Sequence, residues 1–165
     1  MEHLKIFIEL TRLNKPIGFM LLFWPCSWGL AYGYGLDQEL NIFLYYILLF
    51  FLGSVLMRSA GCIFNDIVDK DFDKKVQRTK LRPIACGKVS IKQSVIYVLI
   101  LCLIAFLILI QFNLQTIYLG LGSMLLAFSY PFMKRITYWP QLFLGLTFNW
   151  GMIMGYTAIL DQISF

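Results

Sequence analysis

Four long uncharged stretches limit the fold of this chain more than any other feature of its sequence. They cover residues 17–36, 40–57, 93–133 and 136–160. A helix needs about 20 mostly apolar residues to cross a bilayer, and the third stretch can hold two such helices joined by the polar segment 111–115. The pattern predicts an all-α integral membrane protein with about five transmembrane helices, at 17–35, 41–61, 94–110, 116–131 and 139–160.

The composition supports a membrane protein and argues against two other classes. Hydrophobic residues make up 59% of the chain and charged residues 14%, with a mean hydropathy of +0.73, whereas about 25% of the residues of a soluble domain are charged. The four cysteines form no C-x-x-C pair and the chain has one histidine, so no structural zinc site is expected. The first apolar stretch begins too late and runs too long for a cleavable signal peptide.

The positions of the basic residues predict the orientation of the helices. All 14 Lys and Arg residues fall within 5–15, 58–92 and 134–135. Five spans place these regions on one side of the membrane, and the opposite connections contain no base. The positive-inside rule then puts the N-terminus and the acidic segment at 65–73 in the cytoplasm, as in a bacterial inner membrane. The net charge of +5 suits the anionic headgroups of a lipid bilayer better than nucleic acid.

An acidic segment follows the second predicted span. Residues 65–73 read N-D-I-V-D-K-D-F-D, with four carboxylates and one amide. In a helix, Asn65, Asp69 and Asp73 lie at i, i+4 and i+8, and Asp66 lies three residues before Asp69, so all four share roughly one face. Carboxylates are disfavoured at the C-terminal end of a helix, which argues against a merely solvated helix end. Since Mg²⁺ takes carboxylate and phosphate oxygens, the segment predicts a magnesium site.

Basic and aromatic residues near this segment could bind an anion. Arg58 lies about two helical turns before Asn65 and hence on the same face; it either reaches the interface as an ordinary snorkelling residue or binds the anion. Tyr130 and Lys134 end the fourth span on the same side of the membrane and are either interfacial anchors or a phosphate-binding pair. Arg12 by default is an ordinary residue of the positive side of the membrane.

Two segments are expected outside the membrane spans. Residues 1–16 predict an amphipathic helix that lies along the interface. Residues 62–92 predict a cytoplasmic extension of the second helix followed by a loop, with a turn at 82–88 where Pro and Gly occur. Ser90 is placed to cap the next helix.

These motifs together resemble those of a known family. The patterns N-D-x-x-D-x-x-x-D at 65–73 and Y-x-x-x-K at 130–134 are complete. With Arg78-Thr79, Arg82-Pro83 and Lys15-Pro16-Ile17-Gly18, the chain resembles the UbiA superfamily of intramembrane prenyltransferases over essentially its whole length. Within that superfamily, the R-S-A-G-C and Y-P-F-M-K-R segments are most similar to enzymes that prenylate 4-hydroxybenzoate in ubiquinone biosynthesis.

The resemblance implies a larger fold than this chain can form. The superfamily has about nine spans and holds Mg²⁺ between two aspartate-rich motifs, of which 65–73 matches the first. After Asp73 the sequence has one acid, Asp161. We therefore expect residues 1–165 to form a single incomplete domain, an N-terminal portion of the larger bundle that lacks half of the metal site.

The resemblance also implies substrates and residue roles. The substrates are a polyprenyl diphosphate and 4-hydroxybenzoate. The implied catalytic residues are Asp69, Asp73, Lys134 and Tyr130. The implied metal ligands are Asn65, Asp66, Asp69 and Asp73, and the implied diphosphate ligands are Arg58, Arg78, Lys134 and Arg12. Arg82 is a hypothetical partner for the carboxylate of the aromatic substrate.

Three alternatives remain open from the sequence. The chain could be an inactive remnant, or a subunit that works only beside a chain with the second motif. It could be an enzyme of the same superfamily with homogentisate, dihydroxynaphthoate or haem as the acceptor. It could also handle ions at a cytoplasmic metal site, an alternative that leaves Tyr130, Lys134 and the arginine matches without a role.

Overall fold

The fold is a bundle of helices. The computed structural model describes residues 2–35 and 39–160, without the side chains of Glu2, Lys134 and Arg135. Within this part of the chain the structure contains no strand, and its helices are α1 (Glu2–Thr11), α2 (Ile17–Gly33), α3 (Leu40–Val68), α4 (Lys70–Asp73), α5 (Ile91–Leu109), α6 (Leu114–Ile136) and α7 (Pro140–Ile159).

Five of these helices correspond one for one to the predicted spans, and the predicted fold class is confirmed. Of the described helices, α3, α5, α6 and α7 are long and apolar enough to cross a membrane. Helix α2 is apolar but has 17 residues, so at about 1.5 Å per residue it is slightly shorter than the bilayer core. Helix α3 continues seven residues beyond its predicted end at 61, and α6 continues through Pro131.

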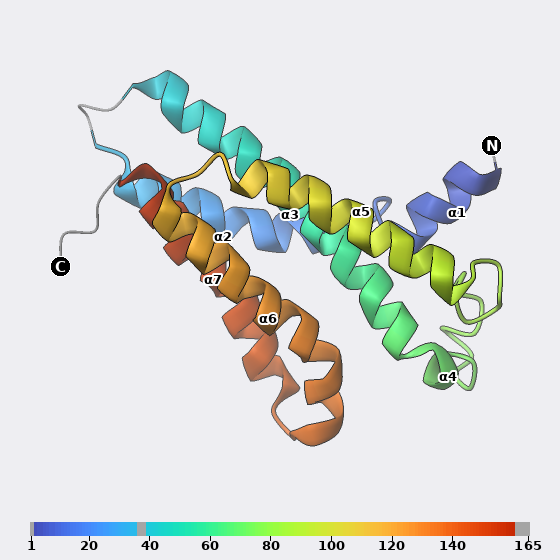
Figure 1. Cartoon of the computed structure of the whole chain (residues 1–165). Coiled ribbons are helices and arrows are strands. Elements are labelled where there is room, and N and C mark those ends of the chain that lie inside the picture. Colours follow the sequence, from blue (N-terminus) through green and yellow to red (C-terminus); the bar gives the residue numbers. More distant parts are fainter. Residues whose placement is uncertain (1, 36–38, 161–165) are drawn as a thin grey trace.

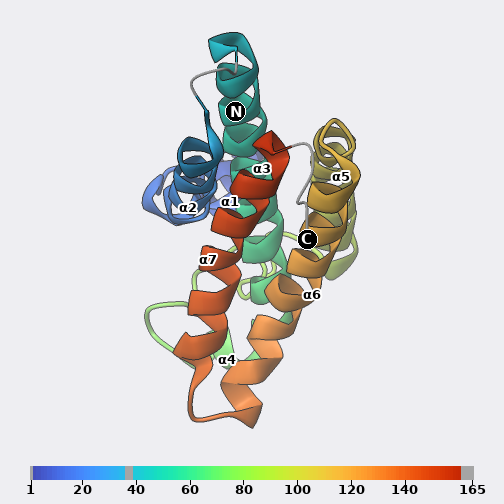
Figure 2. The ribbon, with the colours of Figure 1, turned by 90° about the vertical axis from the view of Figure 1, so that its left-hand side faces the viewer.

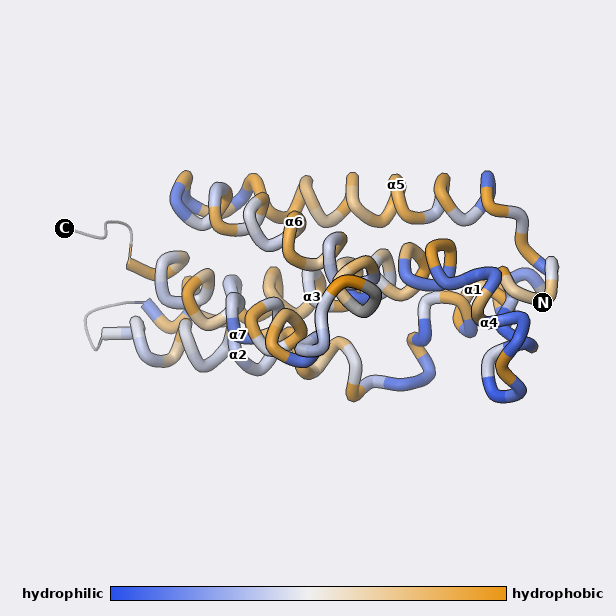
Figure 3. The backbone as a smooth tube through the Cα atoms, turned by 90° about the horizontal axis from the view of Figure 1, so that it is seen from below, coloured by the Kyte–Doolittle hydropathy of each residue, from blue (hydrophilic) through white to orange (hydrophobic). Residues whose placement is uncertain are grey.

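The basic segments gather at one end of the molecule (Figure 1). Helix α1, helix α4 with the loop that follows it, and the α6–α7 turn lie away from the α5–α6 turn and the C-terminal end of α7. Hydrophilic backbone colours concentrate around α1 and α4 (Figure 3). The described helices therefore have the up-and-down topology that the distribution of Lys and Arg predicts.

Helices α2 and α7, far apart in the sequence, pack backbone against backbone (Figure 2). A Cβ atom added at Gly29 would lie 2.0 Å from the carbonyl oxygen of Met152. One added at Gly155 would lie 2.0 Å from the carbonyl oxygen of Cys26. Only glycine permits this approach at both places, as expected of small residues between membrane helices.

A second apolar cluster fixes the polar end of the bundle. It joins α1, α3, α5 and the loop between α4 and α5, and its buried members are Leu10, Ala60, Ile63, Ile84, Val98 and Leu101. Residues 83–85 of the predicted turn are thus buried, whereas residues 86–88 are exposed. The cap predicted at Ser90 is confirmed, because its hydroxyl accepts a hydrogen bond from the Gln93 N–H and the Gln93 side chain accepts one from the Ser90 N–H.

Candidate active site

The acidic segment does not form one continuous helix. Helix α3 ends at Val68, Asp69 has φ −89° and ψ 4°, and α4 begins a new turn at Lys70. The backbone still turns across this point, because the Asp69 N–H donates to the Asn65 carbonyl oxygen at 2.9 Å and the Asp73 N–H donates to the Asp69 carbonyl oxygen at 2.8 Å. That all four metal-ligand candidates share one face stays a prediction, and the contact of both Asp66 and Asp73 with Arg82 Nη1 agrees with it.

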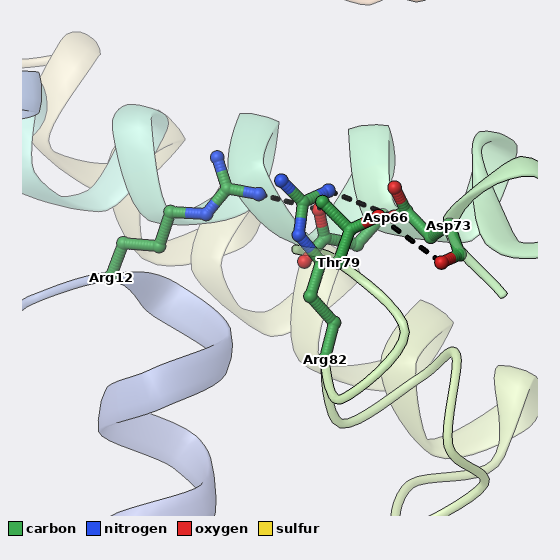
Figure 4. Close-up of polar contacts among 5 residues, drawn as sticks. All are labelled: Arg12, Asp66, Asp73, Thr79 and Arg82. Carbon is green, nitrogen blue, oxygen red and sulfur yellow. Dashed lines mark hydrogen bonds and ion pairs between the residues drawn. The ribbon is translucent and has the colours of Figure 1, made fainter. Parts of the chain in front are cut away.

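Arg82 joins two of the four candidates. Its Nη1 atom donates to Asp66 Oδ1 at 3.0 Å and to Asp73 Oδ2 at 2.8 Å (Figure 4). Asp66 and Asp73 are 3% and 8% exposed, so both carboxylates are buried. Thr79, on the same loop as Arg82, donates its hydroxyl to the Asp73 carbonyl oxygen at 3.1 Å. These contacts tie the loop after α4 to the end of α3.

Arg12 approaches the same carboxylate from another direction. Its Nη2 donates to Asp66 Oδ1 at 2.6 Å, so two guanidinium groups converge on one oxygen (Figure 4). Arg12 follows the last residue of α1 and has φ +57°. The Leu13 N–H donates to Ile8 and the Arg12 N–H to Glu9, the hydrogen-bond pattern of a helix end at which glycine normally occupies the left-handed position.

A polar cleft opens beside these ion pairs. It has a volume of about 1080 Å³ and lies between α1, the start of α2, the polar part of α3 and the loop after α4. Among the described residues its basic lining side chains are Lys5, Arg12, Lys15, Arg58, Arg78 and Arg82, and its acidic ones are Glu9 and Asp66. This excess of positive charge suits a multiply charged anion.

Arg58 reaches the cleft across the start of α2. A Cβ atom at Gly18 would lie 2.8 Å from Arg58 Nε, so the glycine leaves the space that the guanidinium occupies. The four arginine candidates therefore lie together, although Arg12, Arg58, Arg78 and Arg82 come from three separate segments. Arg58 therefore lines the same cleft as the other arginines, and its role in anion binding stays a prediction.

The structure does not assemble a finished metal site. In the described part of the chain, no three His, Cys, Asp or Glu side chains form a group that could hold a metal ion. Mg²⁺ is commonly held by one or two carboxylates with substrate phosphates supplying further oxygens. Asn65, Asp69 and Asp73 offer oxygen donors of the right type, so their chemistry fits Mg²⁺. Their role as ligands stays a prediction.

Tyr130 lies on a helix that contacts the end of α3. The ring of Phe64 packs edge-on against Phe128 with centroids 4.8 Å apart, and against Phe132 at 6.3 Å. Tyr130 is between these two positions on α6 and is partly buried. Pro131 leaves the helix intact to Ile136. The side chain of Lys134 lies outside the described residues, so its predicted pairing with Tyr130 stays a prediction.

An apolar cavity of about 130 Å³ lies deeper in the bundle, among α2, α3, α5, α6 and α7. Leu22 and Met57 line it, whereas their sequence neighbours Leu21 and Arg58 line the polar cleft. The cleft and the apolar cavity therefore lie next to each other along α2 and α3.

The family of this chain follows from comparison with known proteins. Residues 22–165 match the UbiA prenyltransferase family. The chain belongs to the UbiA prenyltransferase family. Together with its long apolar helices, this membership makes it an integral membrane protein and confirms the resemblance seen in its motifs.

Similar UbiA family members come from animals and bacteria. The mitochondrial 4-hydroxybenzoate polyprenyltransferase of Caenorhabditis elegans is 48% identical over 98% of this chain and 45% of its own length. The human enzyme of the same name is 49% identical over 94% and 42%. The 4-hydroxybenzoate octaprenyltransferase of Pseudomonas fluorescens is 48% identical over 95% and 52%. The chain thus spans about half the length of the relatives it matches.

Solved structures share the UbiA fold. A UbiA homologue from Archaeoglobus fulgidus bound to GPP and Mg²⁺ has a TM-score of 0.76 at 15% identity, over 96% of this chain and 56% of that one. The apo structure of a homologue from Aeropyrum pernix has a TM-score of 0.74 at 25% identity, over 88% and 51%. These likenesses establish the arrangement of the helices.

Proposed function

We propose that this chain supplies the diphosphate-binding part of an enzyme that transfers a polyprenyl group to 4-hydroxybenzoate in ubiquinone biosynthesis. The observation that carries the proposal is the cleft in which Arg12, Arg58, Arg78 and Arg82 lie beside the acidic segment. The names of the relatives at 48–49% identity, all 4-hydroxybenzoate prenyltransferases, support the choice of acceptor.

The arginines would hold the donor by its diphosphate. Guanidinium groups form paired, charge-assisted hydrogen bonds to phosphate oxygens, and their charge stabilises the leaving group as the C–O bond breaks. Bound Mg²⁺ would neutralise further charge on the diphosphate. Asp69 and Asp73 are the proposed principal ligands, with Asn65 in support, and the Mg²⁺-bound UbiA homologue agrees with a divalent metal in the family.

The chemistry at the other end of the donor is a carbon–carbon bond formation. The allylic carbon that loses diphosphate bonds to the ring carbon ortho to the phenol hydroxyl, and that ring carbon loses its proton. Tyr130 is proposed to lie near the developing cation and Lys134 to contact the diphosphate. Arg82 is proposed to face the ring carboxylate, in addition to its two ion pairs. The prenyl tail would leave the cleft towards the apolar cavity and the lipid.

Residues 1–165 would act as one unit of a larger site. The proposal includes a second chain, or a further part of the same protein, that contributes the second aspartate-rich motif. It places the N-terminus and the 62–92 region on the cytoplasmic side of a bacterial inner membrane. The bacterial relative supports that location, whereas the animal relatives are named as mitochondrial.

The test is an assay of membranes that contain this chain, with Mg²⁺, a polyprenyl diphosphate and radiolabelled 4-hydroxybenzoate. It is run with and without the part of the Pseudomonas fluorescens relative that this chain does not cover. Product that disappears in Asp69→Ala supports the proposal, and product only with the added part assigns the chain as a subunit. If neither mixture gives product while the complete relative is active in the same membranes, the chain is a non-catalytic remnant and the proposal fails.

A further inference from the structure

Asp66 has surroundings that differ from those expected of a metal ligand. Its Oδ1 accepts from Arg12 Nη2 at 2.6 Å and from Arg82 Nη1 at 3.0 Å. A divalent cation bound to that oxygen would lie close to two positive charges in a site that is almost closed to solvent. The same two charges stabilise the carboxylate without any metal. Asp66 is therefore built into the structure as an acceptor for arginine.

The two arginines come from segments that are far apart in the sequence. Arg12 lies at the junction of α1 and α2, and Arg82 lies on the loop between α4 and α5. Both side chains are partly exposed, at 29% and 27%, and both line the cleft. Each guanidinium thus has one nitrogen on the buried carboxylate while the group as a whole borders the cleft.

The backbone of Arg12 gives a second, independent observation. Its φ of +57° is a conformation that is unfavourable for a residue with a Cβ atom, and glycine would avoid that cost at this helix end. Non-glycine residues persist in such conformations mainly where function or surrounding structure requires them. The ion pair of the Arg12 side chain with Asp66 is a gain that glycine could not supply at this position.

We propose that Asp66 is a positioning residue that holds the guanidinium groups of Arg12 and Arg82 at the wall of the cleft for the diphosphate of the prenyl donor, and that it is not a ligand of the metal. This inference rests on the proposed function. It separates the acidic segment into two roles, because Asn65 and Asp69 keep the proposed metal role, whereas Asp66 organises the anion site. Asp73 takes part in both, since Arg82 contacts one of its oxygens.

The proposal is tested by measuring the binding of geranyl diphosphate and of Mg²⁺ separately. The full chain is used in detergent or nanodiscs together with the part of the Pseudomonas fluorescens relative that it does not cover. Geranyl diphosphate is titrated at saturating Mg²⁺, and Mg²⁺ is titrated at saturating geranyl diphosphate. For Asp66→Asn we expect the affinity for geranyl diphosphate to fall about 10- to 100-fold, as misplacement of binding groups does, with Mg²⁺ half-saturation unchanged. For Asp69→Asn we expect the Mg²⁺ half-saturation to rise.

The outcomes separate the two proposals. If the wild-type chain with the added part binds no geranyl diphosphate in the presence of Mg²⁺, while the complete relative does, the proposed function is contradicted and so is the role of Asp66. If the wild type binds but Asp66→Asn raises the Mg²⁺ half-saturation as Asp69→Asn does, Asp66 is a metal ligand and only the further inference is overturned. Unaltered binding of both ligands by a folded Asp66→Asn also overturns it.

Two further variants keep the test decisive if Asp66→Asn does not fold. Asp66→Glu retains the carboxylate and is expected to recover part of the affinity for geranyl diphosphate. Arg12→Gly relaxes the left-handed backbone, so its thermal midpoint should not fall much, yet geranyl diphosphate should bind more weakly with Mg²⁺ half-saturation unchanged. A folded Arg12→Gly that binds geranyl diphosphate as tightly as the wild type contradicts the positioning role.

Discussion

Asp66 and Asp73, on opposite sides of the break between α3 and α4, share one guanidinium nitrogen of Arg82. This contact sets the path of the chain after the membrane span, because it binds the start of the loop and its middle to the same point. The loop then adds Ile84 to the apolar cluster against α3 and α5. One ion-paired side chain and one apolar side chain therefore close the polar end of the bundle.

Removal of Arg82 should destabilise the protein. Arg82→Gln leaves Asp73 without this partner and Asp66 with Arg12 alone, and breaking a buried ion pair from one side costs about 3 kcal/mol. The measurement is the free energy of unfolding in detergent, followed by limited proteolysis of the 74–90 loop. Lys74→Gln is the matched control, because it removes an exposed pair with Asp71 and should have no measurable effect. Equal stabilities of the two variants would contradict the structural role of Arg82.

The close approach of α2 and α7 should tolerate no methyl group. Gly29→Ala or Gly155→Ala places a Cβ atom 2.0 Å from a carbonyl oxygen of the other helix, so the helices must separate at a cost of about 3 kcal/mol. Gly145→Ala on α7 is the control, since nothing lies within 4 Å of its added Cβ atom. Thermal unfolding of the three variants checks this, and a wild-type midpoint for Gly29→Ala would show that α2 and α7 pack differently.

A methyl group at Gly18 should affect binding more than folding. The added Cβ atom would lie 2.8 Å from Arg58 Nε, at the flexible end of that side chain, so Arg58 can move at little cost. We expect Gly18→Ala to weaken geranyl diphosphate binding about tenfold, equivalent to about 1.4 kcal/mol, with the thermal midpoint nearly unchanged. Arg58→Ala should reach at least the same loss. Normal binding by Gly18→Ala together with weak binding by Arg58→Ala would mean that the position of Arg58 is not critical.

The cap of α5 should contribute to the free energy of unfolding independently of the ion pairs. Ser90→Ala removes the acceptor for the Gln93 N–H and should cost about 1 kcal/mol of unfolding free energy. Ser129→Ala serves as a comparison, because that hydroxyl bonds only to Leu126 within its own helix and its loss is expected to change little. Denaturant unfolding measures both losses of stability. If Ser129→Ala costs as much as Ser90→Ala, the capping box does not stabilise the start of α5.

Much of the fold was predictable because it depends on local composition. The absence of charge over 93–133 together with the polar residues at 111–115 was enough to predict α5, α6 and the turn between them. Asn113 then secures that turn, by accepting from the Thr116 N–H and donating to the Thr157 carbonyl oxygen. The ion pairs at the end of α3 were not predictable, because Arg82 lies 16 positions after Asp66 on a loop that folds back onto α3.

For the candidate site too, the residue types were predictable from the sequence and the long-range contacts were not. The arginines were identifiable by type and by their motifs, and the structure brings them to one cleft. The partnership of Arg12 with Asp66 was not, since 54 residues separate them and no sequence pattern indicates an arginine at a left-handed helix end. Residue types therefore indicate what a site can bind, whereas long-range contacts determine which carboxylate serves which purpose.

The packing of α2 against α7 also limits how the protein can be made. The surface of α2 around Gly29 can pack against α7 only after residues 140–159 have left the ribosome. The ribosome adds about 5–20 residues per second. For several seconds the newly inserted α2 must reside in lipid with its closest neighbour still unsynthesised. Biogenesis of this protein should therefore depend on an insertion machinery that shelters an early helix until a late one arrives.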